Sequence, residues 1–286
     1  MQTLDSIAQL RRALEGQNSV ALVPTMGNLH AGHLDLVKLA KQQATCVVVS
    51  IFVNPLQFGA NEDLANYPRT LAADCEKLQA AGADIVFVPS VAEMYPDFDG
   101  QDLKQSITVQ LPAVANDLCG ASRPGHFAGV ATVVLKLFNL VQPQVAVFGK
   151  KDYQQLFIIR EMVKQFNLAI AILSADTVRE PSGLAMSSRN GYLSHAEKAQ
   201  ASQLHAELVS VCAQIKQQGH SADFSSLEQA ATLKLVQQGW QVDYVAIRAA
   251  SNLQAASGQD SDLVVLAAAK LGTTRLIDNL SLKLEA

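Results

Sequence analysis

The fold is decided by residues 20–33, VALVPTMGNLHAGH. The stretch begins with an apolar run, residues 20–23, which is typical of a buried strand. It continues through a turn that holds Gly27 and Gly32, and the following segment, 34–40, has apolar residues at helical spacing. A strand, a glycine-bearing turn and a helix start therefore follow one another here. This order predicts the first unit of an α/β fold.

The same turn carries two histidines, His30 and His33, at the predicted start of the helix. A helix N-terminus offers unpaired N–H groups and a partial positive charge, and imidazoles donate hydrogen bonds to phosphate oxygens. The glycines let the backbone approach a ligand closely. The pattern H-x-G-H in this setting indicates nucleotidyl transfer at the α-phosphate of ATP. The alternatives are a metal-binding pair, which would need further Cys or acidic ligands that do not cluster nearby, and ordinary surface histidines.

Composition narrows the class of protein further. Of the 286 residues, 49% are apolar and 17% are charged, which allows a substantial core and excludes a disordered chain. The formal net charge is −4 and the lysines and arginines are scattered, so we expect neither a nucleic-acid groove nor a membrane-binding face. The first 18 residues lack the apolar stretch of a signal peptide, and the four cysteines are far apart. We expect a cytoplasmic protein with reduced thiols.

The first two-thirds of the chain alternates strand and helix. The expected strands are 20–23, 46–52, 84–88, 145–148 and 169–173, and the expected helices are 4–15, 33–43, 70–81, 127–141 and 152–166. Strands such as 47–52 are apolar on both faces, as in a parallel sheet covered by helices on each side. This pattern predicts a doubly wound α/β sheet, in which ligands bind beyond the carboxyl ends of the strands.

The character of the sequence changes near Val178. A loop is followed by a long predicted helix, 195–218, and then by short predicted strands at 242–247, 263–266 and 275–277. We therefore expect two domains, a larger one over 1–177 and a smaller α+β domain over 178–286.

Several further motifs lie just after predicted strands. Residues 54–59, NPLQFG, offer the uncharged amide of Gln57 to a ligand, and a plain strand-exit loop is the alternative. The loop at 118–130 carries Arg123 and His126, which fit either an anion site or a capped helix with an exposed arginine. Residues 148–155, FGKKDYQQ, place a lysine where it can reach phosphate, and Asp152 is also a good helix N-cap. Residues 186–190, MSSRN, offer two hydroxyls and a guanidinium, as in a phosphate-binding loop, or a pair of N-cap serines.

Together these motifs resemble those of the pantoate–β-alanine ligase family of H-x-G-H nucleotidyltransferase-like enzymes. The matching segments are 24–33, 50–59, 67–70, 123–130, 151–155 and 183–190; they occur in the family's order and cover most of the chain up to Tyr192. The resemblance implies that ATP and (R)-pantoate give pantoyl adenylate and pyrophosphate. β-Alanine then attacks the adenylate to give pantothenate and AMP. It also implies a Rossmann-like first domain, a smaller lid-like second domain and a homodimer.

The resemblance carries roles to individual positions. Catalysis would rest on His33 as proton donor, with His30 and Lys151. Gln57 and Gln155 would bind pantoate, and Gln57 would also lie beside β-alanine. The expected ATP-binding residues are Met26, Gly27, Asn28, Leu29, His30, Ala31, Gly32, His33, Gly149, Lys150, Lys151, Asp152, Val178, Met186, Ser187, Ser188 and Arg189.

Three positions leave questions open. Asp74 matches a position linked to Mg²⁺, which ATP would bring, but a solvated carboxylate on a surface helix is an equal alternative. Lys150 stands where the family usually has a glutamate, and it either adds charge near the phosphates or points to solvent. The family loop containing Arg123 and His126 has no assigned role here.

Two other functions compete with this interpretation. One is a different H-x-G-H adenylyltransferase, which would leave AMP on a phosphorylated, pantetheine-like acceptor. The other is a regulatory nucleotide-binding module with a degraded site, which would bind ATP without releasing pyrophosphate. The intact histidines, lysine and serine pair weigh against the second.

Overall fold

The computed structural model describes residues 1–59 and 64–285. Its strands are β1 (Gln2–Leu4), β2 (Val20–Thr25), β3 (Cys46–Ile51), β4 (Ile85–Phe87), β5 (Val145–Gly149), β6 (Ala171–Ala175), β7 (Gln241–Ala249), β8 (Asp262–Leu271) and β9 (Thr274–Lys283). Its α-helices are α1 (Ile7–Leu14), α2 (Ala31–Gln43), α3 (Leu71–Ala81), α4 (Val91–Met94), α5 (Cys119–Ser122), α6 (His126–Val141), α7 (Tyr153–Gln165), α8 (His195–Gln218) and α9 (Phe224–Gln237). The short 3₁₀ turns are η1 (Pro55–Gln57), η2 (Ala113–Asn116), η3 (Lys150–Asp152), η4 (Ser188–Tyr192) and η5 (Gly219–Ser221).

Contacts divide the chain into two compact units. The first consists of Met1–Ala115, Arg123–Lys150 and Gln155–Asp176, and the second of Asn116–Ser122, Lys151–Gln154 and Thr177–Ala286. Two short segments near Cys119 and Lys151 thus pack with the second unit, although both lie inside the expected 1–177 domain. A boundary drawn along the sequence could not anticipate this, because it assigns continuous stretches only.

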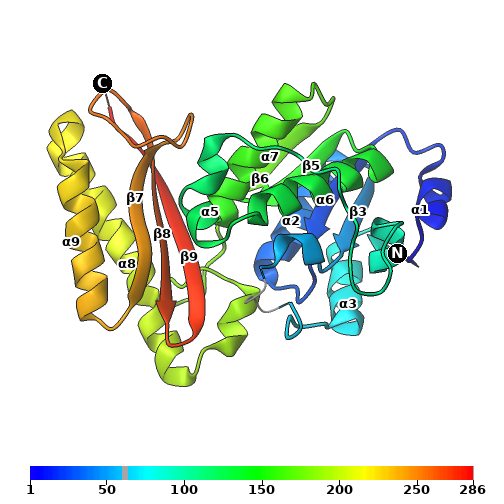
Figure 1. Cartoon of the computed structure of the whole chain (residues 1–286), viewed down its shortest axis with the longest axis horizontal. Coiled ribbons are helices and arrows are strands. Elements are labelled where there is room, and N and C mark those ends of the chain that lie inside the picture. Colours follow the sequence, from blue (N-terminus) through cyan, green and yellow to red (C-terminus); the bar gives the residue numbers. More distant parts are fainter. Residues whose placement is uncertain (60–63, 286) are drawn as a thin grey trace. The chain divides into compact units, whose positions relative to one another are not determined.

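The first unit is built on a parallel sheet. Within the described residues it has six strands in the order β1-β4-β3-β2-β5-β6, and every neighbouring pair is parallel. Successive side chains of a strand point to opposite faces. Val20, Leu22 and Val48 accordingly pack in one apolar cluster with α1, α6 and α7, and Ala21 and Val47 pack in another with α2 and α3. Helices therefore cover both faces of this sheet (Figure 1).

The direction of winding reverses between β2 and β5. From β2 the chain proceeds through β3 and β4 to one side, whereas β5 and β6 lie on the other side. Ala21 pairs with Val145 and Leu22 with Ala146. The carboxyl ends of these two strands, Thr25 and Gly149, thus flank the topological switch point, where sheets of this kind bind their ligands.

The described residues of the second unit form a three-stranded antiparallel sheet, β7-β8-β9, with helices on one face. Figure 1 shows α8 and α9 side by side against this sheet, in agreement with their contacts to its strands and to each other. Leu263, Val265 and Ala267 of β8 pack with Leu204 and Leu208 of α8 in its core. The two sheets confirm the predicted fold class, a Rossmann-like doubly wound α/β sheet with a smaller α+β part.

Some elements differ from the expectation. β1 was not predicted, because three residues are too few to show an alternating pattern. α9 was also missed, although Asp223 caps it by accepting a hydrogen bond from Ser226 N. β8 is longer than the expected strand 263–266, since its second half contains Ala267–Ala269, and alanine is a poor indicator of strands.

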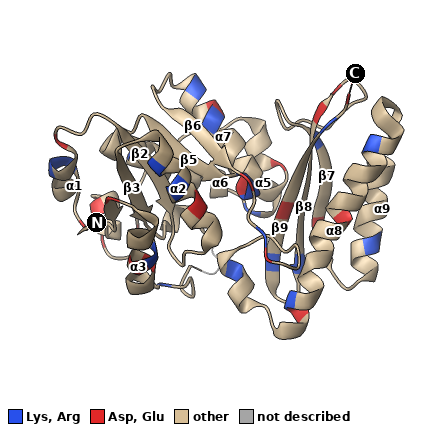
Figure 2. Ribbon diagram, turned by 180° about the vertical axis from the view of Figure 1, so that it is seen from behind, with Lys and Arg blue, Asp and Glu red and all other residues tan. Residues whose placement is uncertain are grey.

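The charged residues and the cysteines are distributed over both units. Figure 2 shows basic and acidic positions interspersed over the helices of both units. The four cysteines are all free thiols. Within residues 1–59 and 64–285, none of the helices combines the length and apolar character needed to traverse a lipid bilayer.

Candidate active site

The H-x-G-H segment links β2 to α2 as predicted. His30 is the N-cap of α2, with an extended backbone, and His33 lies in the first turn. The two imidazole rings lie side by side with centroids 4.1 Å apart and planes tilted by 37°, and both residues are half-buried. The first turn of α2 thus presents two imidazoles beside the end of β2, on the side of the sheet where the winding reverses.

The capping geometry also determines which ring nitrogen of His33 carries the proton. The main-chain N–H of His30 donates to Nδ1 of His33 at 3.3 Å. A ring whose Nδ1 accepts a hydrogen bond carries its proton on Nε2 when it is neutral. His33 therefore offers an Nε2–H donor, which is the form that a proton donor or an oxyanion-binding group needs.

Gln57 lies close to the same loop. It closes η1 directly after β3, and its Nε2 donates to the sulfur of Met26 at 3.0 Å. Asn54 donates to Gln57 Oε1 at 3.1 Å and to Gly129 O at 3.2 Å. Tyr95 in turn donates from its hydroxyl to Asn54 Oδ1. The amide of Gln57 is thus held in a defined orientation, as a ligand-binding amide requires.

The loop before α6 supports Gln57 from its main-chain side. The guanidinium of Arg123 lies 2.9 Å from Nε2 of His126, and Nδ1 of His126 lies 2.8 Å from Gln57 O. Because arginine only donates, Nε2 accepts and Nδ1 donates to the carbonyl. A Cβ on Gly129 would overlap with Leu56 O, so only glycine allows α6 to approach η1 this closely. The open question about Arg123 and His126 is thereby answered in structural terms, since both hold the Gln57 main chain.

The segment after β5 contains the two lysines. Gly149 ends the strand, Lys150 begins η3, and Lys150 Nζ forms an exposed ion pair with Asp176 at 2.6 Å. Lys150, which stands where the family usually has a glutamate, therefore has an acidic partner directly after the neighbouring strand β6. Gln155 lies half-buried in the first turn of α7.

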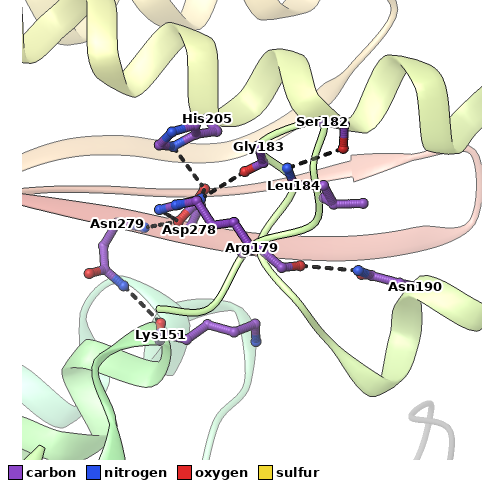
Figure 3. A network of polar contacts seen from close by, with 10 residues as sticks. Lys151, Arg179, Ser182, Gly183, Leu184, Asn190, His205, Asp278 and Asn279 are labelled. Atoms are coloured by element: carbon purple, nitrogen blue, oxygen red, sulfur yellow. Dashed lines mark hydrogen bonds and ion pairs between the residues drawn. The ribbon is translucent and has the colours of Figure 1, made fainter. Parts of the chain in front are cut away.

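In the second unit, Lys151 and the loop at 177–190 are connected to β9. Lys151 is about one-fifth exposed (20% of its side chain), and its carbonyl accepts a hydrogen bond from Asn279 Nδ2 at 2.8 Å. Asp278, the residue before Asn279, binds both terminal nitrogens of Arg179 at 2.6 and 2.9 Å. Figure 3 shows Asn279 reaching toward Lys151 while Asp278 meets Arg179 and His205.

The surroundings of Asp278 explain why its carboxyl group is ionised. Burial by itself would raise the pKa of this carboxyl. The contact with His205 at 3.6 Å, the hydrogen bonds from Arg179 and the positive charge of Arg179 outweigh burial, so the pKa of Asp278 is lowered. Asp278 is therefore ionised at neutral pH and forms a charged anchor for the loop.

The serine-rich motif follows on the same loop. Met186 N donates to Val178 O at 2.9 Å. Ser187 is the N-cap of η4, which contains Ser188 and Arg189, and its hydroxyl accepts from Arg189 N at 3.2 Å. The alternative of an N-cap serine is thus correct for Ser187, and it leaves a phosphate-binding role open for this turn.

Asp74 lies in the first turn of α3, where its side chain is completely buried (0% exposed). Both of its oxygens accept hydrogen bonds from the protein. The alternative of a solvated carboxylate is therefore wrong. Because this carboxylate has no exposed surface and both of its oxygens accept protein hydrogen bonds, Asp74 does not fit the role of a metal ligand.

The sequence missed Asn54 and Tyr95, which orient Gln57, Lys77, whose Nζ donates to Leu29 O, and Asp278, which binds Arg179. Asn54 stood inside a recognised motif and is the one that the pattern could have revealed. The others lie far along the chain from the residues that they hold, and a single sequence carries no signal for such pairs.

Comparison with known proteins agrees with this geometry. The profile of the family described as pantoate-beta-alanine ligase matches residues 1–281. A pantothenate synthetase from Methylobacillus flagellatus is 60% identical over 280 residues, which cover 98% of each chain. One from Thiobacillus denitrificans is also 60% identical, over 98% of this chain and 96% of the relative.

Solved structures give the same result. The crystal structure of pantothenate synthetase from Thermus thermophilus superimposes with a TM-score of 0.90 at 42% identity, covering 98% of this chain and 99% of that one. The pantoate-beta-alanine ligase from Francisella tularensis, solved as a complex with beta-gamma ATP and beta-alanine, has a TM-score of 0.81 at 34% identity, over 98% and 97% of the chains. By profile, sequence and fold alike, this chain belongs to the pantoate-beta-alanine ligase family.

Proposed function

We propose that the chain joins (R)-pantoate to β-alanine in two steps driven by ATP. A carboxylate oxygen of pantoate attacks the α-phosphorus of ATP, the bond to the β-phosphate breaks, and pyrophosphate leaves. The amine of β-alanine then attacks the carbonyl carbon of pantoyl adenylate and loses a proton, and AMP leaves. The observation that carries this proposal is the close His30–His33 pair at the start of α2, beside the winding reversal of the sheet.

In the first step the enzyme brings two anions together. Cations and oriented N–H groups offset the repulsion between carboxylate and phosphate as charge develops in the transition state. We assign this role to His33, with its Nε2–H, to His30 and to Lys151. The loop from Met26 to His33 and the segment Gly149, Lys150 and Asp152 line the ATP site in this scheme. Holding both substrates in one site supplies much of the remaining rate enhancement.

Pantoate and β-alanine need neutral donors and acceptors. We assign pantoate to the amides of Gln57 and Gln155, and β-alanine to Gln57. The hydrogen bonds that Gln57 receives from Asn54 and at its carbonyl from His126 support this role, because they hold its amide in place before the substrate arrives.

The C-terminal part of the chain has a protective role in this scheme. We propose that residues 1–177 bind the nucleotide and pantoate, and that residues 178–286 act as a lid that protects the water-sensitive adenylate. Val178 would meet adenine through its backbone, and Met186, Ser187, Ser188 and Arg189 would hold phosphates. The network that connects Lys151 and Arg179 to β9 supports a shared role for these segments.

Mg²⁺ enters this scheme as the ion bound to ATP. Magnesium in nucleotide sites usually keeps several waters and is bound through substrate phosphates and one or two carboxylates. Because both oxygens of Asp74 accept hydrogen bonds from the protein, the phosphates of ATP would hold the ion in this scheme.

We further propose a homodimer that acts in the cytoplasm on small molecules, with no nucleic-acid or membrane partner. The support is the family resemblance together with the dispersed charges of the chain and its four free thiols.

The function is tested by incubating the protein with ATP, pantoate and β-alanine, omitting each in turn and following pyrophosphate and AMP. Without β-alanine we expect a burst of about one pyrophosphate per site, because the adenylate stays bound. With all three substrates, free AMP should form continuously. AMP retained on the product would indicate the competing adenylyltransferase, and ATP binding without pyrophosphate would indicate a regulatory module.

A further inference from the structure

The carboxylate of Asp74 is bound by the H-x-G-H loop itself. Oδ2 accepts from Asn28 N at 2.8 Å and from the Thr70 hydroxyl at 3.0 Å, and Oδ1 accepts from Leu29 N at 2.8 Å. The side chain has no exposed surface. Two consecutive main-chain N–H groups therefore point at one buried carboxylate.

Lys77 completes the contact from the next turn of α3. Its Nζ donates to Leu29 O at 2.7 Å and lies 3.9 Å from Asp74 Oδ1. The helix thus holds both polar groups of one residue, the N–H of Leu29 through the aspartate and its C=O through the lysine. Leu29 is the residue immediately before His30.

The backbone of the loop explains why it needs such support. Gly27 has φ +85° and Asn28 has φ +51°, so two consecutive residues adopt the left-handed region. For a non-glycine residue this conformation is unfavourable unless contacts stabilise it. A Cβ on Gly27 would also lie 3.3 Å from Asp74 Oδ2, so the carboxylate and the glycine are packed closely together. These contacts determine the direction in which the main chain leaves the loop.

The direction of the main chain affects the catalytic imidazole of His33 through one further hydrogen bond. The N–H of His30 donates to Nδ1 of His33 and thereby selects the Nε2–H form of the ring. We infer that Asp74 is a positioning residue, not a metal ligand: through Asn28 and Leu29 it holds the main chain that orients His30 and sets the tautomer of His33. The inference rests on the proposed function for its kinetic consequences.

The test compares Asp74→Asn with Glu76→Gln, an exposed carboxylate on the same helix. The amide keeps the size of the side chain but can accept from only one of the two N–H groups. We expect Asp74→Asn to slow the single-turnover release of pyrophosphate by about tenfold or more, a loss within the range found for misplaced catalytic groups. The ATP and Mg²⁺ concentrations that give half the maximal rate should change by less than about threefold, because no ligand contact is removed. Glu76→Gln should behave as wild type.

A spectroscopic measurement separates this role from the catalytic reaction. The imidazole ¹⁵N spectrum of the ligand-free protein, recorded where the rings are neutral, should show His33 in the Nε2–H form. The spectrum of Asp74→Asn should show a mixture of tautomers. Because this readout needs no turnover, it tests the inference even if the protein makes no pyrophosphate.

Three results would overturn the inference. A variant that recovers the wild-type rate at high Mg²⁺ would identify Asp74 as a metal ligand. An unchanged rate would remove any functional role. An unchanged His33 tautomer in a folded Asp74→Asn protein would break the proposed chain of contacts.

If Asp74→Asn does not fold, Lys77→Met provides the second variant, since Lys77 is partly exposed and holds the same residue by its carbonyl. It should be folded and should show a smaller loss of rate, about threefold to tenfold, with Lys77→Arg restoring the rate. A folded Lys77→Met protein with the wild-type rate and the wild-type His33 tautomer would overturn the inference.

Discussion

Two buried aspartates hold the two segments to which we assign phosphate chemistry, and they do so by different means. Asp74 holds the H-x-G-H loop through neutral main-chain N–H groups, and the partly exposed Lys77 lies 3.9 Å away. Asp278 holds the 177–190 loop through a two-point ion pair with Arg179. The side chain of Asp278 is 3% exposed and that of Arg179 is 19% exposed. The first arrangement sets a backbone direction, whereas the second fixes two opposite charges.

The difference predicts different consequences of substitution. Removing the charge of Asp74 leaves unpaired dipoles in a loop to which we assign catalytic groups, so the rate should decrease most. Removing the charge of Asp278 leaves a guanidinium with little solvent around it, so stability should suffer most.

Asp278→Ala is the strongest test of this contrast. Breaking a buried ion pair by removing one partner costs about 3–5 kcal/mol, because the remaining charge is uncompensated. The matched control is Asp262→Ala, which removes an exposed partner of Lys283 on the same sheet (side-chain exposure 64% and 75%) and should cost less than about 1 kcal/mol. Denaturant unfolding of both variants measures the difference. Equal losses would show that the Asp278 pair does not stabilise the second unit.

His33→Ala and Lys151→Ala compare the two segments directly. If both act on the same nucleotide, each should lower the rate of adenylate formation by at least about tenfold, because each removes a donor from the developing negative charge. Rapid-quench measurement of pyrophosphate without β-alanine gives this rate. A near-wild-type rate for either variant would remove that segment from the chemical step.

Acid should affect the Asp278 pair before it affects neutral hydrogen bonds of the same unit. The pKa of Asp278 is lower in the folded protein than in the unfolded chain, so its contribution to stability is present above the unfolded value, about pH 4, and is lost as pH falls toward the folded pKa. Unfolding free energies of wild type and Asp278→Asn should therefore converge below about pH 4. A constant difference down to about pH 2 would contradict the assignment of an ionised carboxyl.

Lys150→Ala should have the smallest effect. Its ion pair with Asp176 is exposed, at 41% and 89% of the side chains, and such pairs contribute less than about 1 kcal/mol. We expect a change in adenylation rate below about fivefold, in contrast to the neighbouring Lys151→Ala. A loss as large as that of Lys151→Ala would show that Lys150 contacts the phosphates despite Asp176.

The fold class could be predicted from the sequence because the local apolar patterns coincide with the strands and helices of the structure. The apolar run before Pro24 and the two-faced strand at Cys46–Ile51 predict a covered parallel sheet, and the sheet is found. The positions of His30, His33 and Gln57 just after strands were likewise readable, since the carboxyl ends of parallel strands share one edge.

What the sequence could not give are contacts between distant residues. The pairs Asp74–Leu29 and Asp278–Arg179 span 45 and 99 residues. Nothing local distinguishes Asp74 from an ordinary helix carboxylate, which is why a metal ligand and a surface residue were equal alternatives. Arg123 and His126 suggested an anion site for the same reason, because their partner, the Gln57 carbonyl, is invisible in a pattern of side chains.

The central claim is that the carboxylate of pantoate attacks the α-phosphorus of ATP. Turnover with pantoate carrying ¹⁸O in its carboxylate, followed by mass spectrometry of the products, tests it most directly. We predict one ¹⁸O in each AMP and one in the amide carbonyl of the product, because the bridging oxygen leaves with AMP. Label in pyrophosphate or inorganic phosphate, or AMP without label, would contradict the account.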